Sequence, residues 1–422
     1  MTDRIGAEVA VVGGGLGGVA AALALLQRGR RVVLTEEYAW LGGQLTSQAA
    51  APDEHSWAEQ LGGTARYRNL REKISQGRGR VGKPCHEPRV AEAAITELLA
   101  PYRSSGRLTV LQPAEPVAAE MSGAAVRAVT VRNPLTEAET EITAGFFVDA
   151  TEAGDLLPLT GTAYAVGAEA RSEHGEPSAP EVADPADVQP IAWCFGFDHV
   201  DGDHTIERPR DYDLWRSFEL PFEDGFAVGD VVLANWPQLG YVGGSAIDFE
   251  SRPAHFAAAK AQARAYFYWL QTEAPRPDGG HGWPGLRLRG DLVGTDDGFA
   301  QAPYIRESRR IKALTTIREQ DLSGKARGDA GFAVPLGALI PVVTQNLLPA
   351  GKNIGTTHIT SDAYRPHPVE WNIGEAAGEL AAFCLDHGLR SQQVATDPEL
   401  IHQYQTRLAE AGVELHRPEI AR

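Results

Sequence analysis

The sequence of 422 residues contains only three cysteines, and they are far apart: Cys85, Cys194 and Cys384. No two of them form a CxxC pair, the spacing typical of zinc sites and of redox-active disulfides. The same spacing argues against an iron–sulfur cluster held by cysteine. We therefore expect no metal centre, and we expect any electron transfer to depend on a bound organic cofactor.

Long apolar runs and blocks of basic residues are also missing. No run approaches the roughly 18 to 20 apolar residues that a membrane-spanning helix needs, and the N-terminus does not begin like a secretory signal. Acidic residues outnumber basic ones, 56 to 39, so the formal net charge is −17. An acidic surface disfavours nucleic acids and anionic membranes as partners. These features predict a cytoplasmic protein that binds neither.

Glycine is concentrated at one informative place near the N-terminus. The apolar run Val9 to Val12 leads into Gly13-Gly14-Gly15-Leu16-Gly17-Gly18, and a second apolar run, Val32 to Leu34, leads to Glu36. Strand, glycine-rich turn, helix, strand and acid thus follow one another in the order of a dinucleotide-binding unit. In such a unit the unpaired N–H groups at the start of the helix face the phosphates.

Three glycines in this stretch have separate predicted tasks. Gly13 permits the tight turn after the first strand, Gly15 lets the backbone approach a pyrophosphate, and Gly18 lets the helix pack closely on the sheet. Glu36 follows Gly18 by 18 residues, near the spacing at which an acid meets a ribose hydroxyl. A tight strand–helix turn without a ligand is the alternative.

Periodicity and turn residues predict further elements along the chain. Apolar spacing predicts a helix over 89–103, alternating runs predict β structure over 107–150, and proline marks a surface loop over 177–190. A long helix is expected over 253–273, with an aromatic group near its end that we assign to the core. The last part of the chain is expected to finish in a helix that begins near Ile373.

Three later stretches complete the pattern of the glycine-rich unit. Residues 146–151 form an apolar strand that ends in small residues, and residues 346–351 form another. Residues 372–378 open a helix with small residues on one face. A helix N-terminus at that point would stabilise negative charge, such as that on a reduced flavin ring.

Together with the Leu41-to-Thr46 loop, these stretches resemble the FAD-dependent oxidoreductases of the glutathione-reductase-like two-domain class. More narrowly, they are similar to the subfamily related to fumarate reductase flavoproteins. The resemblance implies an α/β fold: a Rossmann-like FAD-binding domain, with a parallel sheet and an antiparallel β-meander, and an inserted α+β substrate domain. We expect the FAD-binding domain over 1–155 and 331–422, and the substrate domain over 156–330.

The resemblance also implies which residues contact FAD. The glycine-rich turn belongs at the pyrophosphate, the acids after the second strand at the ribose, and the later stretches along the ribityl chain and flavin ring. The full set is Gly13, Gly15, Leu16, Gly17, Gly18, Glu36, Glu37, Gly42, Gly43, Gln44, Leu45, Val117, Ala150, Thr151, Asn353, Asn372, Ile373 and Gly374. Many relatives have an aspartate after the late Ala-Gly pair, whereas this chain has Lys352-Asn353. Asn353 offers hydrogen bonds there, and Lys352 offers a partner for phosphate.

The candidate catalytic residues precede the last predicted helix. They are His358, Tyr364, Arg365 and His367, followed by Glu370. Histidine shuttles protons near neutral pH, and arginine holds a carboxylate with two parallel hydrogen bonds. A purely structural role for this loop is the alternative.

Two further groups of residues have open roles. His55 follows the loop expected at the flavin, and it is a candidate second proton-transfer group or covalent flavin anchor. Arg306, Arg309 and Arg310 either bind an acidic substrate or lie along a solvated helix face, and we favour the solvated face.

These features predict an FAD-dependent enzyme that moves a hydride, or two electrons, to or from a small organic substrate. A second glycine-rich nucleotide unit is missing, because the Gly240-to-Gly244 stretch lacks the strand and the acid. We therefore favour a dehydrogenase or oxidase, reoxidised by oxygen or another acceptor. A flavin-dependent monooxygenase and a non-catalytic electron-transfer flavoprotein are the alternatives, and a homo-oligomer stays open.

Overall fold

The computed structural model describes residues 3–50, 52, 62–77, 85–215, 218–220, 225–322 and 332–415. The candidate residue His55 therefore lies outside the described residues. No helix in the described ranges is both long and apolar enough to cross a membrane.

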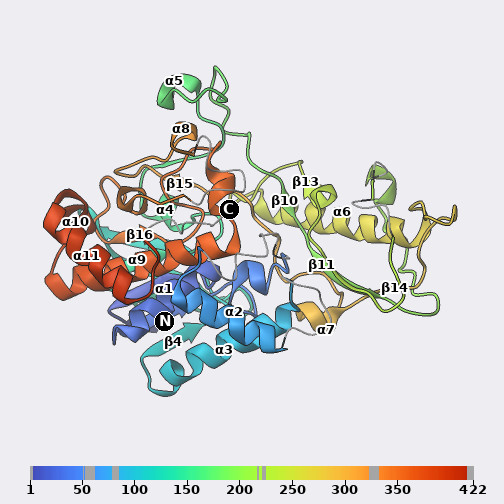
Figure 1. The fold of residues 1–422 in the computed structure, drawn as a ribbon, viewed down its shortest axis with the longest axis horizontal. Coiled ribbons are helices and arrows are strands. Elements are labelled where there is room, and N and C mark those ends of the chain that lie inside the picture. The colour runs from blue at the N-terminus through green and yellow to red at the C-terminus, as the bar shows by residue number, and fades with distance from the viewer. Residues whose placement is uncertain are drawn as a thin grey trace, which may run out of the picture.

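A five-stranded parallel sheet lies at the centre of one part of the molecule (Figure 1). Its order is β16-β8-β2-β3-β4, with the bounds Leu347–Pro349, Phe146–Asp149, Val9–Val12, Val32–Thr35 and Leu108–Leu111. Every residue of β2, β3, β8 and β16 is buried. Parallel strands that are covered on both faces need such continuous apolar runs. The early and late stretches singled out in the sequence thus become neighbouring strands.

Two helices cross in direct backbone contact beside this sheet. They are α1 (Leu16–Gln27) and α9 (His367–His387). A Cβ added to Gly374 would lie 2.0 Å from the Gly17 carbonyl oxygen, and one added to Gly378 would lie 2.6 Å from the Ala21 carbonyl oxygen. Only glycine permits this approach.

The expectation of a helix that begins near Ile373 is wrong. Helix α9 begins at His367, with Pro366 as N-cap and Pro368 in its first turn. Proline fits the first helical turn because its missing N–H has no partner there. Gly374 therefore lies two turns inside the helix, facing α1, and not at a helix N-terminus.

The predicted β-meander is present next to the parallel sheet. Strands β5 (Glu115–Ser122), β6 (Ala125–Arg132) and β7 (Glu139–Thr143) pair in antiparallel order, and β1 (Asp3–Gly6) adds a parallel strand to β7. The predicted helix over 89–103 is confirmed as α3 (Pro88–Ser104).

A second hydrophobic core forms in the described residues of 191–305, here called the aromatic region. A three-stranded antiparallel sheet of order β12-β11-β14 packs with the long helix α6, and β10 pairs with β13. Their bounds are Val231–Ala234, Phe195–His199, Leu286–Leu288, Arg252–Thr272, Ile191–Ala192 and Gly240–Tyr241. Figure 1 shows this region extending away from the parallel sheet. Helix α6 confirms the predicted 253–273 helix, and its buried aromatic residues confirm their assignment to the core.

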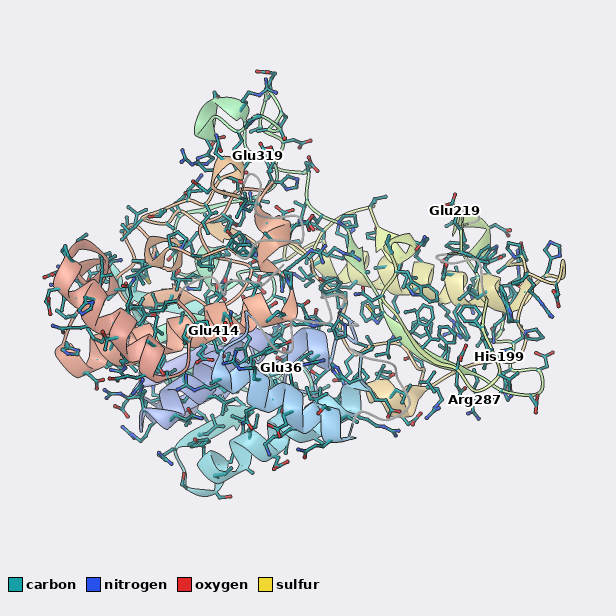
Figure 2. All side chains as sticks on the ribbon, viewed as in Figure 1. Glu36, His199, Glu219, Arg287, Glu319 and Glu414 are labelled. Atoms are coloured by element: carbon teal, nitrogen blue, oxygen red, sulfur yellow. The ribbon has the colours of Figure 1, made fainter. Side chains whose placement is uncertain are left out.

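The two parts are also distinguished by labelled side chains in Figure 2. Glu36 lies in the part built on the parallel sheet, whereas His199 of β11 and Arg287 of β14 lie at the far end of the aromatic region.

The predicted solvated helix face at Arg306 to Arg310 is wrong. Arg309 is 3% exposed and Arg310 is fully buried. Arg310 starts the short strand β15 (Arg310–Ile311), which pairs with β9 (Tyr164–Ala165). Carboxylates compensate the buried charges, because Arg310 contacts Glu169 and Glu307. The arginines at 306, 309 and 310 do not reveal such internal partners in the sequence alone.

The remaining elements are short connections or cover the surface. The 177–190 stretch contains no helix or strand, as predicted. The other helices are α2 (Ala65–Gly77), α4 (Leu156–Leu159), α5 (Arg171–His174), α7 (Gly290–Val293), α8 (Glu319–Leu322), α10 (Ser391–Thr396) and α11 (Pro398–Glu410). Single 3₁₀ turns are η1 (Gly43–Leu45), η3 (Tyr212–Trp215), η4 (Pro237–Leu239), η5 (Leu336–Leu339) and η6 (Ser361–Tyr364).

Candidate cofactor and active site

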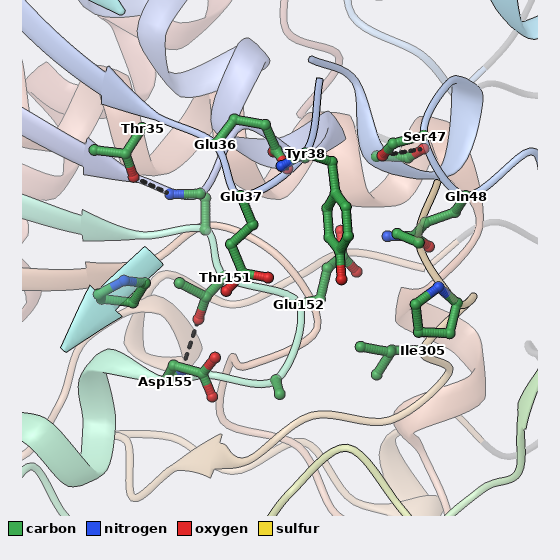
Figure 3. Close-up of a pocket in the computed structure, with 18 of the residues that line it drawn as sticks. Thr35, Glu36, Glu37, Tyr38, Ser47, Gln48, Thr151, Glu152, Asp155 and Ile305 are labelled. Carbon is green, nitrogen blue, oxygen red and sulfur yellow. Dashed lines mark hydrogen bonds between the residues drawn. The ribbon is translucent and has the colours of Figure 1, made fainter. Parts of the chain in front are cut away.

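A pocket opens where β2, β3 and β8 end (Figure 3). Ligands of open α/β sheets bind at this carboxyl edge of the strands. The pocket is narrow, with a cavity volume of about 40 Å³. Its lining residues are Gly13, Gly15, Thr35, Glu36, Glu37, Tyr38, Gly43, Ser47, Gln48, Ala114, Pro116, Ala150, Thr151, Glu152, Ala153, Asp155, Arg252, Phe256, Ala302, Pro303 and Ile305.

The glycine-rich turn has the geometry predicted for it. Gly13 has a φ of +100°, and a Cβ there would lie 2.3 Å from the Ala150 carbonyl oxygen. A Cβ at Gly18 would lie 2.1 Å from the Gly13 carbonyl oxygen and 3.0 Å from the Ala150 Cβ. Gly13 therefore makes the turn, and Gly18 lets the helix pack against the strand end.

The start of helix α1 faces the pocket without a side-chain cap. Its N-cap is Gly15, which has no side chain to act as a cap, and within the described ranges no side chain accepts a hydrogen bond from the first turn. The first N–H groups of a helix lack internal partners, and the helix dipole adds partial positive charge. An uncapped helix start beside glycines that line a pocket fits a diphosphate, so the residues present fit FAD.

Glu36 directly follows β3 and lines the pocket, and its contact with a ribose stays a prediction. Its Oε2 accepts a hydrogen bond from the Gly14 N–H at 3.0 Å, and its Oε1 accepts one from the Tyr38 N–H at 2.9 Å. Burial raises the pKa of Glu36 to about 8 and that of Glu37 to about 7. Burial also raises the pKa of Asp149, at the end of β8, to about 7. Hydroxyl donors of a ribose would supply the partners that favour ionised Glu36.

A chain of buried polar groups starts at the pocket wall with Glu152. The Glu152 Oε2 accepts a hydrogen bond from Lys352 Nζ, which also lies 3.4 Å from Glu370 Oε2. Gln44 Nε2 donates to Glu370 Oε2 and, at 3.0 Å, to the Arg365 carbonyl oxygen. Burial lowers the pKa of Lys352, but the two carboxylates outweigh it and hold that pKa above its usual value. Lys352 is therefore a fixed cation.

The predicted catalytic residues do not form one cluster. Arg365 lies beside the Glu370 chain, and its Nη1 donates to the Tyr304 hydroxyl at 2.8 Å. His358 belongs to a different group, where its Nδ1 lies 3.0 Å from both carboxylate oxygens of Glu307. The hydrogen bond to Glu307 raises the pKa of His358.

The other two described candidates are buried in the fold. Tyr364 packs against Phe332 with ring centroids 5.1 Å apart, and its buried hydroxyl has no hydrogen-bond partner among the described residues. His367 is 3% exposed and forms the first residue of α9. None of the four described candidates lines the pocket.

The predicted cofactor residues divide into two groups. Those that line the pocket are Gly13, Gly15, Glu36, Glu37, Gly43, Ala150 and Thr151. Those that lie outside its lining are Leu16, Gly17, Gly18, Gly42, Gln44, Leu45, Val117, Asn353, Asn372, Ile373 and Gly374. Gly17 and Gly374 face backbone instead of open space. Contact of the second group with FAD stays a prediction.

The sequence interpretation missed several residues of the pocket. Glu152 and Asp155 directly follow the predicted strand end, and acids at a carboxyl edge are a usable signal. Asp155 holds Arg252 with hydrogen bonds of 2.8 and 2.6 Å and Arg309 with one of 2.8 Å. Arg252 comes from the first turn of α6, and no local pattern predicts that it reaches the pocket.

Comparison with known proteins identifies the family of this chain. The model of the family described as FAD dependent oxidoreductase matches residues 8–331 and 322–408. No curated protein matches the sequence.

Similar solved structures are distant. A geranylgeranyl bacteriochlorophyll reductase-like protein from Thermoplasma acidophilum is 12% identical, with a TM-score of 0.42 over 98% of this chain and 85% of that one. Anhydrotetracycline hydroxylase from Streptomyces rimosus is 15% identical, with a TM-score of 0.41 over 95% and 65%. The p-nitrophenol 4-monooxygenase from Pseudomonas putida is 14% identical, with a TM-score of 0.38 over 96% and 84%. The narrower glutathione-reductase-like and fumarate-reductase-related assignment is not confirmed by them.

Proposed function

The chain belongs to the FAD-dependent oxidoreductases, and we propose that it transfers a hydride, or two electrons, between FAD and a small organic substrate. The observation that carries the proposal is the uncapped start of α1, which faces a pocket between Gly13, Gly15 and Glu36. When bound, FAD supplies the two-electron redox chemistry, and the protein supplies binding, orientation and proton transfer. A dehydrogenase or oxidase is our choice, with oxygen or another acceptor completing the cycle.

Different residues of the pocket would contact different parts of FAD. The N–H groups at the start of α1 would bind the diphosphate, and Glu36 would accept a hydrogen bond from the ribose. Ala114 and Pro116 line the wall near this end, whereas Ser47 and Gln48 follow the η1 turn. Asn353 also supports the site, because its Nδ2 donates to the Asp149 carbonyl oxygen at 3.0 Å.

The aromatic region provides one side of the pocket. Arg252 and Phe256 of α6 line it together with Ala302, Pro303 and Ile305. This placement supports our assignment of 156–330 to an inserted α+β substrate domain, between FAD-binding segments over 1–155 and 331–422. The substrate would then meet the flavin where the two parts of the chain face one another.

The polar chain from Glu152 to Arg365 is our choice for proton transfer and substrate orientation. Gln44 bridges Glu370 and the Arg365 backbone, so the chain connects the η1 turn with the start of α9. Arg365 is held by Asp362 at 2.7 Å and by Tyr304 at 2.8 Å. A guanidinium fixed in this way can orient a carboxylate or carbonyl group of a substrate.

Anaerobic titration of the purified protein tests the proposal. Absorbance of oxidised flavin in the preparation establishes the cofactor. Amines, hydroxy acids and enoates are then added in turn, and we expect one of these compound classes to bleach the flavin absorbance. Bleaching at a rate comparable to turnover supports the dehydrogenase or oxidase. An oxygenated product in place of simple two-electron exchange identifies a monooxygenase. Absence of bleaching together with tight binding to a protein partner supports the electron-transfer flavoprotein and contradicts the proposal.

A further inference from the structure

The carboxylate of Glu152 lies at the start of helix α1. A Cβ added to Gly15 would be 2.7 Å from the Glu152 Oε1, and one added to Gly43 would be 3.0 Å from the same atom. This oxygen therefore covers the two glycines that line the pocket at the end of α1. Figure 3 shows the Glu152 side chain extending into the pocket beside Tyr38.

The two oxygens of this carboxylate have different surroundings. Oε2 is held by the ammonium group of Lys352, whose side chain is 4% exposed. Oε1 is buried and has no hydrogen bond of ordinary geometry with the part of the chain that the structure describes. Burial raises the pKa of this carboxylate, and Lys352 and the nearby Gln48 side chain oppose that rise. A buried carboxylate oxygen without a donor is costly, so its position needs a compensating interaction. The partial positive charge at the uncapped start of α1 provides one.

We propose that Glu152 takes the place of a phosphate at the start of α1 and competes with the cofactor diphosphate for that position. The inference rests on the proposed function, because it takes the α1 start as the diphosphate site. Both anions are attracted by the same helix end, and they repel one another at short distance. Glu152 is thus a residue that limits cofactor affinity, and the diphosphate must displace its carboxylate from Gly15 and Gly43.

Lys352 has a defined part in this exchange. It stays anchored by Glu370 when the carboxylate of Glu152 moves, because its Nζ lies within 3.4 Å of Glu370 Oε2. The displaced carboxylate leaves a buried cation near the diphosphate. Lys352 therefore changes from a partner of Glu152 to a positive charge that favours the cofactor.

Binding of ADP and adenosine to the full chain, stripped of flavin, tests the inference. A flavin-free preparation is used only if added FAD restores the absorbance spectrum of the bound flavin, which shows that the protein is still folded. Glu152→Gln keeps the size of the side chain and removes its charge, so we expect ADP to bind about tenfold more tightly or better. Adenosine lacks the diphosphate, and its affinity should stay within about twofold. Isothermal calorimetry measures both.

Controls separate this effect from general changes of charge or folding. Glu399→Gln removes one exposed negative charge on α11 and should leave ADP affinity unchanged. Glu152→Ala is the second variant if Glu152→Gln unfolds at a lower temperature, and it should tighten ADP binding in the same way. Unchanged or weaker ADP binding by the folded variant overturns the inference. If the wild-type chain binds neither FAD nor ADP, the proposed function fails first.

Discussion

Helices α1 and α9 meet through glycine backbone, whereas the aromatic region is assembled from side-chain rings. In the first case Gly17 and Gly374 bring carbonyl groups within reach of an added Cβ. In the second, the Phe267 ring packs 5.5 Å from Phe195 and 5.8 Å from Phe197, measured between centroids. Backbone contact permits one residue type, but an apolar core accepts several residues of similar volume. The cofactor side is therefore rigidly specified, and the aromatic side has freedom to vary.

Gly17→Ala should have the largest effect, because a Cβ there would lie 1.6 Å from the Ala350 carbonyl oxygen. This overlap is relieved only if the end of β16 or helix α9 moves. We therefore expect a loss of about 3 kcal/mol or more in the free energy of unfolding. Bound flavin should be lost with it. Urea unfolding and flavin absorbance measure the two effects.

Gly29→Ala is the matched control for that substitution. Gly29 has a positive φ, +80°, unlike the helical Gly17, and nothing lies within 4 Å of its added Cβ. Only backbone strain of about 1 to 2 kcal/mol is expected, with flavin retained. Equal losses in the two variants would contradict the assignment of the Gly17 effect to close packing.

The acids of the pocket predict a pH dependence of the flavin-free protein. The pKa of Glu36 is raised from 4.5 to about 8, so the native state binds a proton that the unfolded state releases between these values. Stability should therefore fall as pH rises from about 5 to 8, by at most about 1.4 kcal/mol per unit for each such group. Glu36→Gln should reduce this slope in urea unfolding at pH 5, 6.5 and 8. An unchanged slope would show that Glu36 does not titrate there.

Phe267→Leu should affect stability modestly and flavin hardly at all. Phe267 is fully buried in the aromatic region, and leucine leaves only part of its volume empty. We expect a loss of about 1 to 2 kcal/mol in the free energy of unfolding, with the flavin dissociation constant unchanged. Loss of flavin comparable to that in Gly17→Ala would break the comparison between the two parts.

The smallest stability effects are expected in the loop before α9. Arg365→Lys loses the forked contact with Tyr304 and Asp362, so substrate-driven flavin reduction should slow about tenfold or more at full flavin content. Tyr364→Phe removes a buried hydroxyl that has no partner among the described residues, and it should be neutral within about 0.5 kcal/mol. Stopped-flow measurement of flavin reduction tests Arg365→Lys, and thermal unfolding tests Tyr364→Phe. Equal rates for Arg365→Lys and wild type would remove Arg365 from the active site.

The same comparison explains what could be predicted from the sequence. Local patterns predict the βαβ unit, the strand ends at Ala150 and Ala350, and an acid, Glu36, at the end of β3. They do so because glycine turns and acids at strand ends have few alternative uses. The stretch of small residues around Gly374 predicts the start of α9 too late, whereas Pro366 as N-cap and Pro368 in the first turn mark its true start.

Other features depend on partners that are distant in the sequence. Arg252 reaches the pocket through Asp155, a residue 97 positions earlier. Arg310 is buried because Glu169, 141 positions earlier, compensates it. The polar chain that starts at Glu152 joins Gln44 to Glu370 across 326 positions. A single sequence does not indicate such pairings, and ring packing in the aromatic region has no distinctive pattern.

Gly15→Ala tests the central claim most directly, namely that the start of α1 binds the FAD diphosphate. Gly15 has a φ of −60°, which alanine adopts without strain, and its nearest neighbour is the movable end of the Glu152 side chain. The methyl group therefore changes mainly the space that a ligand enters. The account predicts normal thermal unfolding of the flavin-free protein and an FAD dissociation constant raised about tenfold or more. An unchanged dissociation constant in the folded variant would contradict it.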